Sequence, residues 1–256
     1  LAPLAARAEL KLPRISPDAT VTQTIGTTPI TVTYSRPGVK NRTIWGDLVP
    51  YDKAWRTGAT NATNLTVPDE IMVGGQKLPA GTYSLYTIPG KDTWTVVLNS
   101  DKALVVPFAL KPETDVVKVQ ATPAAAPMQE WLQFSFENLT PNSCDLVMRW
   151  EKLQVAVPIT KDVSAVVLAE AGKAVNSATA DAWRVPYQAA NYAFSNKVGQ
   201  DEGQKWLAQS LKAQENYTNL NLLARWQMQD GKKTEAIATA KKASGAGKAS
   251  KDKVDT

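Results

Sequence analysis

Hydrophobic and polar residues alternate with a period of two from about residue 16 to residue 160. This repeat is typical of β-strands with one buried face. We expect strands at Ala19–Ile25, Ile30–Tyr34, Asn64–Val67, Glu70–Val73, Thr82–Ile88, Thr93–Leu98, Val116–Ala121, Trp131–Glu137, Cys144–Trp150 and Gln154–Ile159. Short strands at regular spacing, with turns between them, predict an antiparallel β-sandwich rather than alternating strands and helices.

Turn residues and aromatic residues within this region support the same fold. Gly74-Gly75 supplies the positive φ angles that a tight hairpin requires. Gly26-Thr-Thr-Pro29 separates the first two strands. Aromatic residues such as Tyr83, Trp94, Phe134 and Trp150 lie within predicted strands. We expect them in the core, because each aromatic side chain buries on the order of 150–250 Å².

After Asp162 the apolar residues recur at helical spacing. We expect helices at Val163–Ala178, Ala180–Lys197, Asp201–Ala213, Asn219–Gln229 and Lys233–Ala243. Asp181 suits an N-cap, and Asp230-Gly231-Lys232 suits a joint between two helices. No stretch with the composition of a flexible linker separates the two halves, so we expect the helices to pack against the sandwich.

Small residues in the helical half fall at spacings that allow two helices to approach closely. They are Ala224, Gly231, Ala236, Ala240 and Ala243, and Gly203 begins a similar run 33 residues before Ala236. This pattern resembles about two degenerate tetratricopeptide units, although Ala-rich helical hairpins also arise without repeat ancestry. Fewer than three such units seldom bury a core alone, which favours packing against the β half. The predicted fold class is therefore α+β.

The formal net charge of +5 is concentrated near the C-terminus. The segment Lys232–Lys253 holds seven lysines against Glu235 and Asp252, so the rest of the chain is formally neutral. Proteins that bind nucleic acids usually spread cations over a folded face beside aromatic residues, so we expect no nucleic-acid partner. The predicted organisation is a leader at 1–15, a β-sandwich domain at 16–160, a helical domain at 161–247 and a disordered basic tail at 248–256.

The first residues suggest export. The chain begins without Met, and Ala6-Arg7-Ala8 follows a small apolar stretch in the pattern of a signal-peptidase site. We therefore expect a signal remnant, a mature protein that starts near Glu9, and a periplasmic or secreted location; an Ala-rich disordered leader is the alternative. No stretch approaches the roughly 20 apolar residues of a membrane-spanning helix, so no membrane span is predicted.

Two compositional facts exclude several kinds of chemistry. The chain has no His, which rules out Ser-His-Asp and Cys-His catalysis and any His-ligated metal. Its single cysteine, Cys144, cannot form an internal disulfide or a thiolate zinc cluster. Cys144 lies within a predicted strand, where an inert buried thiol is expected. We expect no cofactor.

The segment from Tyr34 to Asn61 holds the densest candidate chemistry. It combines Trp, Tyr, Arg, Asp and Pro with little strand-like alternation, and long loops of this kind usually bind a ligand or pack against another domain. The candidate ligand-binding residues are Tyr34, Arg36, Trp45, Tyr51, Trp55, Arg56 and Asn61. Two guanidinium groups near aromatic faces suit a carboxylate, a phosphate or a sugar ring. Alternatively, the arginines fix the loop to backbone carbonyls while the tryptophans fill the end of the sandwich.

Several sequence motifs resemble one known family. They are Tyr34-Ser-Arg-Pro37, Ile44-Trp-Gly46, Leu48-Val-Pro-Tyr51, Trp55-Arg-Thr-Gly-Ala59, Leu78-Pro-Ala-Gly-Thr-Tyr-Ser-Leu85, Ile88-Pro-Gly90, Trp94-Thr-Val96 and Trp150-Glu-Lys152. In this order they are similar to the bacterial family named domain of unknown function 2911, over about Ser16 to Ile159. The helical tail is similar to a C-terminal extension found on many members. The resemblance implies a bacterial protein, commonly with an export signal, and no established reaction or ligand.

One segment departs from the pattern expected for this family. Residues Ser100–Phe108 contain no Trp-Gly pair where an aromatic and Gly-rich stretch is expected. If that region helps to form a family site, this chain has a modified one.

The residues favour a non-catalytic exported binding or interaction module that presents the Tyr34–Asn61 loop. A protein or a small anionic or carbohydrate ligand is the expected partner, and the oligomeric state is left open. A first alternative is a hydrolase that uses Asp47, Asp52 or Asp69-Glu70 on a carbohydrate or envelope component. A second is a structural component of an envelope complex.

Overall fold

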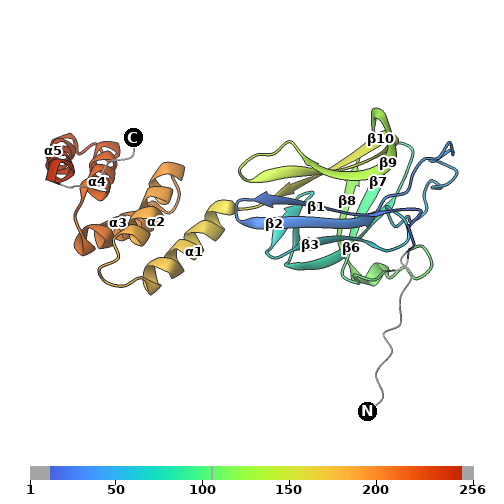
Figure 1. Cartoon of the computed structure of the whole chain (residues 1–256), viewed down its shortest axis with the longest axis horizontal. Helices are drawn as coiled ribbons and strands as arrows, with labels where there is room; N and C mark the ends of the chain where they lie inside the picture. Colours follow the sequence, from blue (N-terminus) through green and yellow to red (C-terminus); the bar gives the residue numbers. More distant parts are fainter. Residues whose placement is uncertain (1–11, 105, 250–256) are drawn as a thin grey trace, which may run out of the picture. The chain divides into compact units, whose positions relative to one another are not determined.

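The computed structural model describes residues 12–104 and 106–249. The chain divides into two compact units, the first ending at Val163 and the second beginning at Ser164 (Figure 1). The first unit holds the described strands, and the second holds five helices in the described part of the chain. The α+β fold class predicted from the sequence is confirmed.

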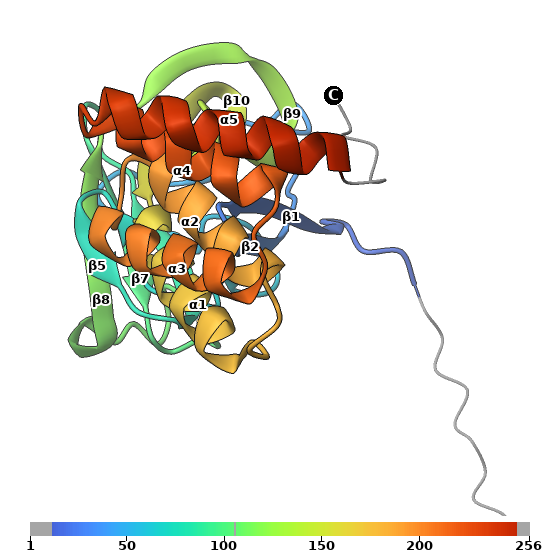
Figure 2. The same cartoon turned by 90° about the vertical axis from the view of Figure 1, so that its left-hand side faces the viewer.

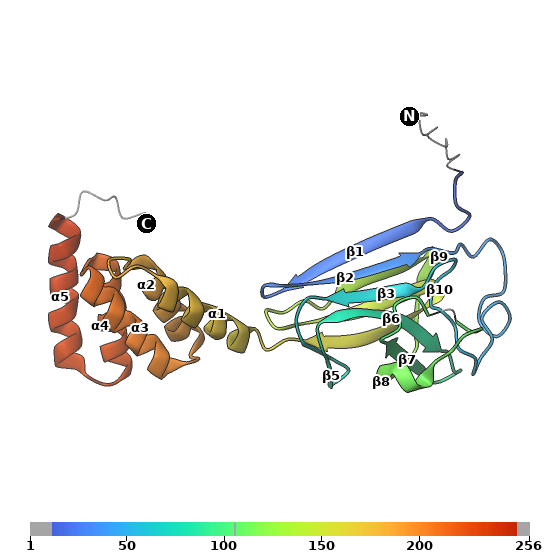
Figure 3. The ribbon, with the colours of Figure 1, turned by 90° about the horizontal axis from the view of Figure 1, so that it is seen from below.

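One sheet of the first unit has six strands in the order β1-β2-β3-β6-β7-β8 (Figure 3). The strands are β1 (Asp18–Ile25), β2 (Thr28–Ser35), β3 (Thr63–Val67), β6 (Gly81–Ile88), β7 (Trp94–Asn99) and β8 (Asp115–Ala121). Every neighbouring pair is antiparallel. The order shows that β2 and β3 are neighbours although a long loop, residues 36–62, connects them.

The other sheet has four antiparallel strands in the order β5-β4-β10-β9. They are β4 (Ile71–Val73), β5 (Gln76–Leu78), β9 (Ala124–Glu137) and β10 (Ser143–Thr160). The hairpin β4–β5 turns at Gly74 and Gly75, whose φ angles of 55° and 79° confirm the positive-φ turn predicted there.

Three strands differ from the sequence prediction. The strand β5 was not predicted, and β9 begins at Ala124 rather than Trp131. The added part of β9 is mostly exposed and contains Pro127, so it lacks the alternation that signals a half-buried strand. The two strands predicted within residues 144–159 are a single strand, β10, with irregular pairing between Arg149 and Leu153. That bulge interrupts the alternation and accounts for the predicted break.

A single hydrophobic core lies between the two sheets. It contains Ile30, Leu65 and Trp94 from the six-stranded sheet and Leu132 and Ile159 from the four-stranded sheet, each with no exposed surface. Burying a side chain of this size contributes about 1.5–3 kcal/mol, so this layer supplies most of the stability of the sandwich.

A second, smaller cluster lies on β6 and β7 beneath residues 100–104 and 106–114. Tyr86 and Val97 point from the strands, and Leu104 and Val106 pack on them from the covering segment. The Tyr86 hydroxyl donates to Asp115 at 3.0 Å, and burial together with this carboxylate raises the pKa of Tyr86. The segment that departs from the family pattern is therefore fixed to the sheet.

The second unit consists of α1 (Val163–Ser177), whose first residue belongs to the first unit, α2 (Arg184–Asn196), α3 (Gln200–Ala213), α4 (Tyr217–Gln229) and α5 (Lys233–Ala249). Helices α2 and α3 pair, as do α4 and α5 (Figure 2). A Cβ on Gly203 would lie 2.6 Å from Trp226 and 2.7 Å from the Ala193 Cβ, so α3 needs glycine there. These hairpins agree with the tetratricopeptide-like extension expected from the sequence.

Two helix boundaries differ from the prediction by more than two residues. Asp181 does not cap α2, which begins at Arg184 after Trp183. Its carboxylate accepts a hydrogen bond from the Thr179 side chain, which lowers the pKa of Asp181, so the residue belongs to a local turn. Helix α5 continues to Ala249, beyond the predicted end at Ala243, so Gly245 and Gly247 lie within it although glycine is unfavourable in a helix.

Two terminal predictions fall mainly outside the described residues. Residues 1–11 hold most of the predicted leader, and 250–256 hold most of the predicted basic tail, although residues 248 and 249 belong to α5. The packing of the helices against the sandwich stays a prediction. Among the described residues, no helix has both the length and the apolar character needed to cross a bilayer.

Candidate functional site

The loop of residues 36–62 bridges the two sheets. Near its start, the Val39 amide donates to the Glu130 carbonyl at 2.9 Å, and the Leu132 amide donates to the Pro37 carbonyl at 3.0 Å. Near its end, Trp55 and Thr87 exchange two backbone hydrogen bonds of 2.7 and 2.9 Å. The loop therefore pairs through its backbone with β9 of one sheet and with β6 of the other.

Four tryptophans from both sheets and the loop form one cluster. Trp45 and Trp55 come from the loop, Trp94 from β7 and Trp150 from β10. The rings of Trp55 and Trp150 are stacked, with centroids 5.7 Å apart and planes at 17°. Trp45 meets Trp94 edge to face at 5.1 Å. We call these four residues the tryptophan cluster; it fixes the loop to the sandwich core.

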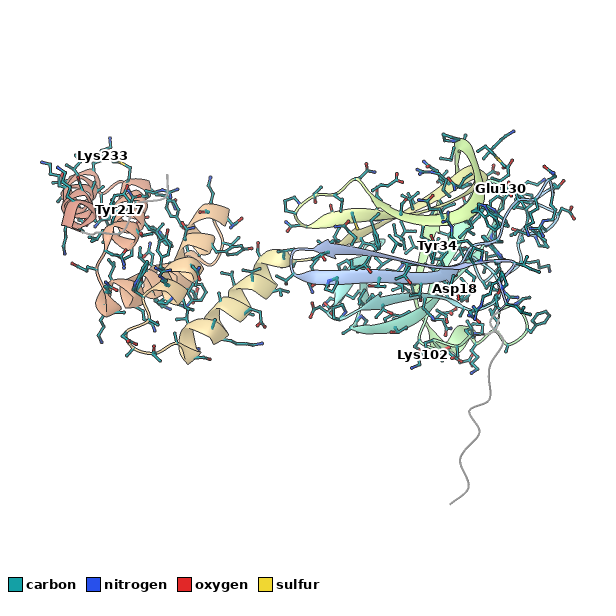
Figure 4. All side chains as sticks on the ribbon, in the orientation of Figure 1. Asp18, Tyr34, Lys102, Glu130, Tyr217 and Lys233 are labelled. Atoms are coloured by element: carbon teal, nitrogen blue, oxygen red, sulfur yellow. The ribbon has the colours of Figure 1, made fainter. Side chains whose placement is uncertain are left out.

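Two of the candidate residues, Tyr34 and Arg36, hold the start of the loop against β9. Tyr34, labelled in Figure 4, is buried, and its hydroxyl accepts a hydrogen bond from the Phe134 amide at 3.0 Å. The Arg36 Nε donates to the Leu132 carbonyl at 2.8 Å. Both side chains make the backbone contacts that anchor a loop, and neither belongs to the described lining of the two cavities next to the loop.

A cavity of about 410 Å³ opens beside the loop. Its walls include Pro37, Val49 and Pro50 from the loop and Val106 and Pro107 from the segment that covers β6 and β7. The side chains with polar or aromatic chemistry in this lining are Ser16, Lys40, Arg42, Trp55, Arg56, Thr60 and Trp150. We call it the loop cavity.

Among the described residues, three cations and no carboxylate line the loop cavity. Arg42 donates from Nε to the Val39 carbonyl at 3.1 Å and from Nη2 to the Gly38 carbonyl at 2.6 Å. Arg56 donates from Nη1 to the Thr60 carbonyl at 3.0 Å. These carbonyls orient the guanidinium groups without neutralising them. The cavity is therefore positively charged and favours an anion.

The third cation, Lys40, lies at the edge of the loop near β9. Its ammonium lies 5.8 Å from the centre of the Trp131 ring. The Glu130 carboxylate accepts a hydrogen bond from the Lys40 backbone amide at 2.9 Å, and no ion pair joins it to the described part of the chain. Glu130 therefore fixes the backbone of the loop at Lys40.

The backbone of this loop is unusually constrained. Positive φ angles occur at five of its non-glycine residues: Lys40 (51°), Asn41 (56°), Asp52 (57°), Thr57 (51°) and Thr60 (60°). For a β-branched threonine this conformation is an outlier. At Gly58, a Cβ would lie 2.8 Å from Thr63 Oγ1 and 3.1 Å from the Ser35 carbonyl. Strained conformations that packing holds in place cluster at ligand sites.

The structure separates the seven candidate residues into three groups. Trp55 and Arg56 line the loop cavity, and Asn61 lines a neighbouring cavity together with Arg56. Trp45 belongs to the tryptophan cluster, and the half-buried Tyr51 packs on Gly46. Tyr34 and Arg36 hold the loop against β9. Ligand binding by any of them stays a prediction.

The sequence reasoning did not select Lys40, Arg42 or Lys102, which line the two cavities. Lys40 and Arg42 belong to the same loop, and the high density of charged residues there was the sequence signal that could have identified them. Lys102 lies in Ser100–Phe108, the segment that the sequence singled out as a departure from the family pattern.

The carboxylates considered for hydrolysis do not meet at the cavity. Asp47 and Asp52 are exposed, and Asp69 accepts a hydrogen bond from Thr28 Oγ1 at 2.6 Å. No three Asp, Glu or Cys side chains within the described ranges converge into a candidate metal site. Burial raises the pKa of the Cys144 thiol to about 11, so it is unsuited to act as a nucleophile.

Comparison with known proteins gives a family for the first unit. The sequence model of one family matches residues 16–159, which spans β1 to nearly the end of β10 and includes the whole loop. No curated protein and no solved structure matches this chain. Because the match covers more than half of the sequence, the chain belongs to the family described as a protein of unknown function, DUF2911.

Proposed function

We propose that this chain is a non-catalytic binding module that holds a small anionic ligand in the loop cavity. The observation that carries the proposal is the cavity lining: Lys40, Arg42 and Arg56 converge on a space that no carboxylate of the described lining shares. An anion entering this space gains charge-assisted hydrogen bonds and displaces no existing ion pair.

The guanidinium groups keep donors available for such a ligand. Arg42 uses Nε and Nη2 for backbone carbonyls, and Arg56 uses Nη1. No described group accepts from Arg42 Nη1 or from Arg56 Nε and Nη2. A carboxylate or phosphate could therefore bind two donors of one guanidinium fork at Arg56, the geometry for which arginine is best suited.

The walls of the cavity suit a ligand that also has an apolar face. The half-buried Trp55 forms its aromatic part, with the buried Trp150 stacked on it, and prolines 37, 50 and 107 form flat apolar surfaces. A volume of about 410 Å³ lies within the usual range of small-molecule sites. An acidic sugar or another ring with an acidic substituent satisfies both the charged and the apolar parts of the lining.

The proposal places this module outside the cytoplasm, in the periplasm or as a secreted protein. Its support is the small-x-small pattern at Ala6-Arg7-Ala8. Fractionation of cells that express the full-length gene tests it: recovery of the protein only in the cytoplasm would contradict this part of the proposal.

Titration with small anions tests the binding function directly. The full chain would be titrated with glucuronate, benzoate and inorganic phosphate, with glucose as the uncharged comparison, and binding followed by calorimetry and by tryptophan fluorescence. We expect at least one anion to bind and glucose to bind more weakly. The double variant Arg42→Gln/Arg56→Gln should weaken anion binding by about tenfold or more, because each lost charge-assisted hydrogen bond contributes about 1.5–3 kcal/mol.

The matched control is Lys53→Gln/Lys91→Gln, which removes the same charge from two exposed lysines that line neither cavity. This control should bind the anion as the unchanged chain does. Equal weakening by both double variants would show that overall charge, rather than the loop cavity, attracts the anion, and the proposal would be wrong.

A further inference from the structure

A second cavity of about 320 Å³ adjoins the loop cavity. Arg56, Thr60 and Val106 line both. Arg56 therefore belongs to the wall of both spaces, and a ligand longer than a single ring can occupy both.

We propose that the ligand is an acidic oligosaccharide that spans both cavities, with acidic groups on successive sugar units. This inference rests on the proposed function, because it extends the ligand of the loop cavity across Arg56. It commits to a charged and hydroxylated chain rather than to an isolated anion.

The chemistry of the second cavity suits a sugar acid. Lys102, labelled in Figure 4, supplies a cation, and Asn61, Asn64 and Thr60 supply amide and hydroxyl groups. No described side chain accepts a hydrogen bond from either asparagine amide nitrogen. Amides and hydroxyls that converge in a cavity bind sugar hydroxyls, which both donate and accept hydrogen bonds. The lysine would bind the carboxylate of the same unit.

Lys102 stands out from its charged neighbours because none of them neutralises it. Asp101 and Lys111 pair with each other at 2.7 Å, so the adjacent carboxylate is already used. No carboxylate of the described residues lies within ion-pair distance of the Lys102 ammonium. The second cavity therefore has its own cation, as the loop cavity has Lys40 and Arg42.

The segment that carries Lys102 is held in place by several contacts. Ser84 Oγ donates to the Asp101 carbonyl at 2.7 Å, and the Asp101 amide donates to Asn99 Oδ1 at 2.8 Å. Leu104, two residues after Lys102, is buried in the smaller hydrophobic cluster on β6 and β7. These contacts fix the backbone on both sides of Lys102. Ligand binding therefore costs conformational entropy only in the Lys102 side chain.

The distribution of cations between the two cavities indicates whether the ligand carries one acidic group or several. Lys40 and Arg42 line only the loop cavity, whereas Lys102 lines only the second. A ligand with a single acidic group can satisfy one set, and a chain with an acidic group on each unit can satisfy both. No aromatic side chain of the described residues lines the second cavity, which disfavours a stacked nucleobase there.

Calorimetry on the full chain with one monomeric ligand and three ligands of three units each tests this inference. The ligands are galacturonic acid, its linear trimer, neutral maltotriose and inorganic tripolyphosphate. We expect the trimer to bind at least tenfold more tightly than the monomer and maltotriose to bind more weakly than the trimer. Lys102→Gln should remove most of the gain of the trimer and leave binding of the monomer unchanged, while Lys91→Gln should change neither.

The possible failures are distinguishable. If the trimer binds no more tightly than the monomer and both depend on Arg42 and Arg56, the inference is wrong and the proposed function stands. The same holds if only benzoate or phosphate binds with that dependence. Tripolyphosphate binding as tightly as the trimer, with the same loss in Lys102→Gln, would overturn the carbohydrate assignment. If no anion binds, both the inference and the proposed function are wrong.

Discussion

The two ends of the β2–β3 loop contain similar residues with different contacts. At the first end Arg36 follows Tyr34 and donates to the carbonyl of Leu132 on β9. At the second end Arg56 follows Trp55, donates to the carbonyl of Thr60 in its own loop and faces two cavities. The two arginines differ in their hydrogen-bond partners. Arg36 donates to strand carbonyls and is a structural anchor, whereas Arg56 donates to a loop carbonyl and is left accessible to a ligand.

The backbone conformations differ in the same way. Around Arg36 the chain continues β2 and then pairs with β9, so its amides and carbonyls have regular partners. Positive φ also occurs after Arg36, at Lys40 and Asn41, but around Arg56 it falls on the β-branched Thr57 and Thr60, and Gly58 lies in close contact with β2. The second end thus holds an energetically costly shape, which is useful where a ligand needs a preformed site.

Replacement of Trp94 with Ala should have the largest effect, because both ends of the loop depend on the tryptophan cluster. Trp94 has no exposed surface and contacts Trp45 and Trp55. We expect a loss of about 3–5 kcal/mol in the free energy of unfolding, measured with urea. Trp94→Phe should lose less. A loss below about 1 kcal/mol for Trp94→Ala would show that the loop is held by other contacts.

Replacement of Arg36 with Ala should have the second-largest effect. It leaves the carbonyls of Trp131 and Leu132 without a charged donor, at a cost of about 1.5–3 kcal/mol in the free energy of unfolding. Anion affinity, measured by calorimetry where the variant is folded, should stay within about twofold of the unchanged chain. Lost affinity with unchanged stability would instead place Arg36 in the binding site.

Replacement of Arg56 with Ala should give the opposite result. Only one hydrogen bond, to an exposed loop carbonyl, is lost, so the free energy of unfolding should fall by less than about 1 kcal/mol. Anion affinity should fall by about tenfold or more. Urea unfolding and calorimetry on Arg36→Ala and Arg56→Ala in parallel would measure the contrast. Equal stability losses would remove the distinction between the two ends.

The sequence alone could not distinguish these two arginines. Both arginines lie in the same loop shortly after an aromatic residue, and only the fold shows that their hydrogen-bond partners differ. Leu132 lies 96 residues from Arg36, whereas Thr60 lies four residues from Arg56. Similarly, Lys102 joins Arg56 at one cavity because residues 100–114 fold over β6 and β7. Local patterns identify a loop rich in candidate groups, and tertiary pairing assigns their roles.

The sandwich itself was more predictable than its site. Alternation gave β2, β6 and β7 to within two residues at each end, because one face of these strands packs on the core. It failed for the first half of β9, where exposed residues around Pro127 have no buried face to mark them. Periodicity reports burial, so it finds a strand only where one face of it is covered.

Salt should produce the smallest effect and separate the two ends without any substitution. Raising sodium chloride from about 0.05 M to about 0.5 M shortens the screening length from more than 10 Å to less than 8 Å. Anion binding at Arg56 should weaken several-fold by calorimetry, because its cations are open to solvent ions. The stability difference between the unchanged chain and Arg36→Ala should stay within about 0.5 kcal/mol, because short hydrogen bonds to fixed carbonyls carry that effect. A similar salt response at both ends would show that Arg36 is as open to ions as Arg56, and the contrast between anchor and binding site would fail.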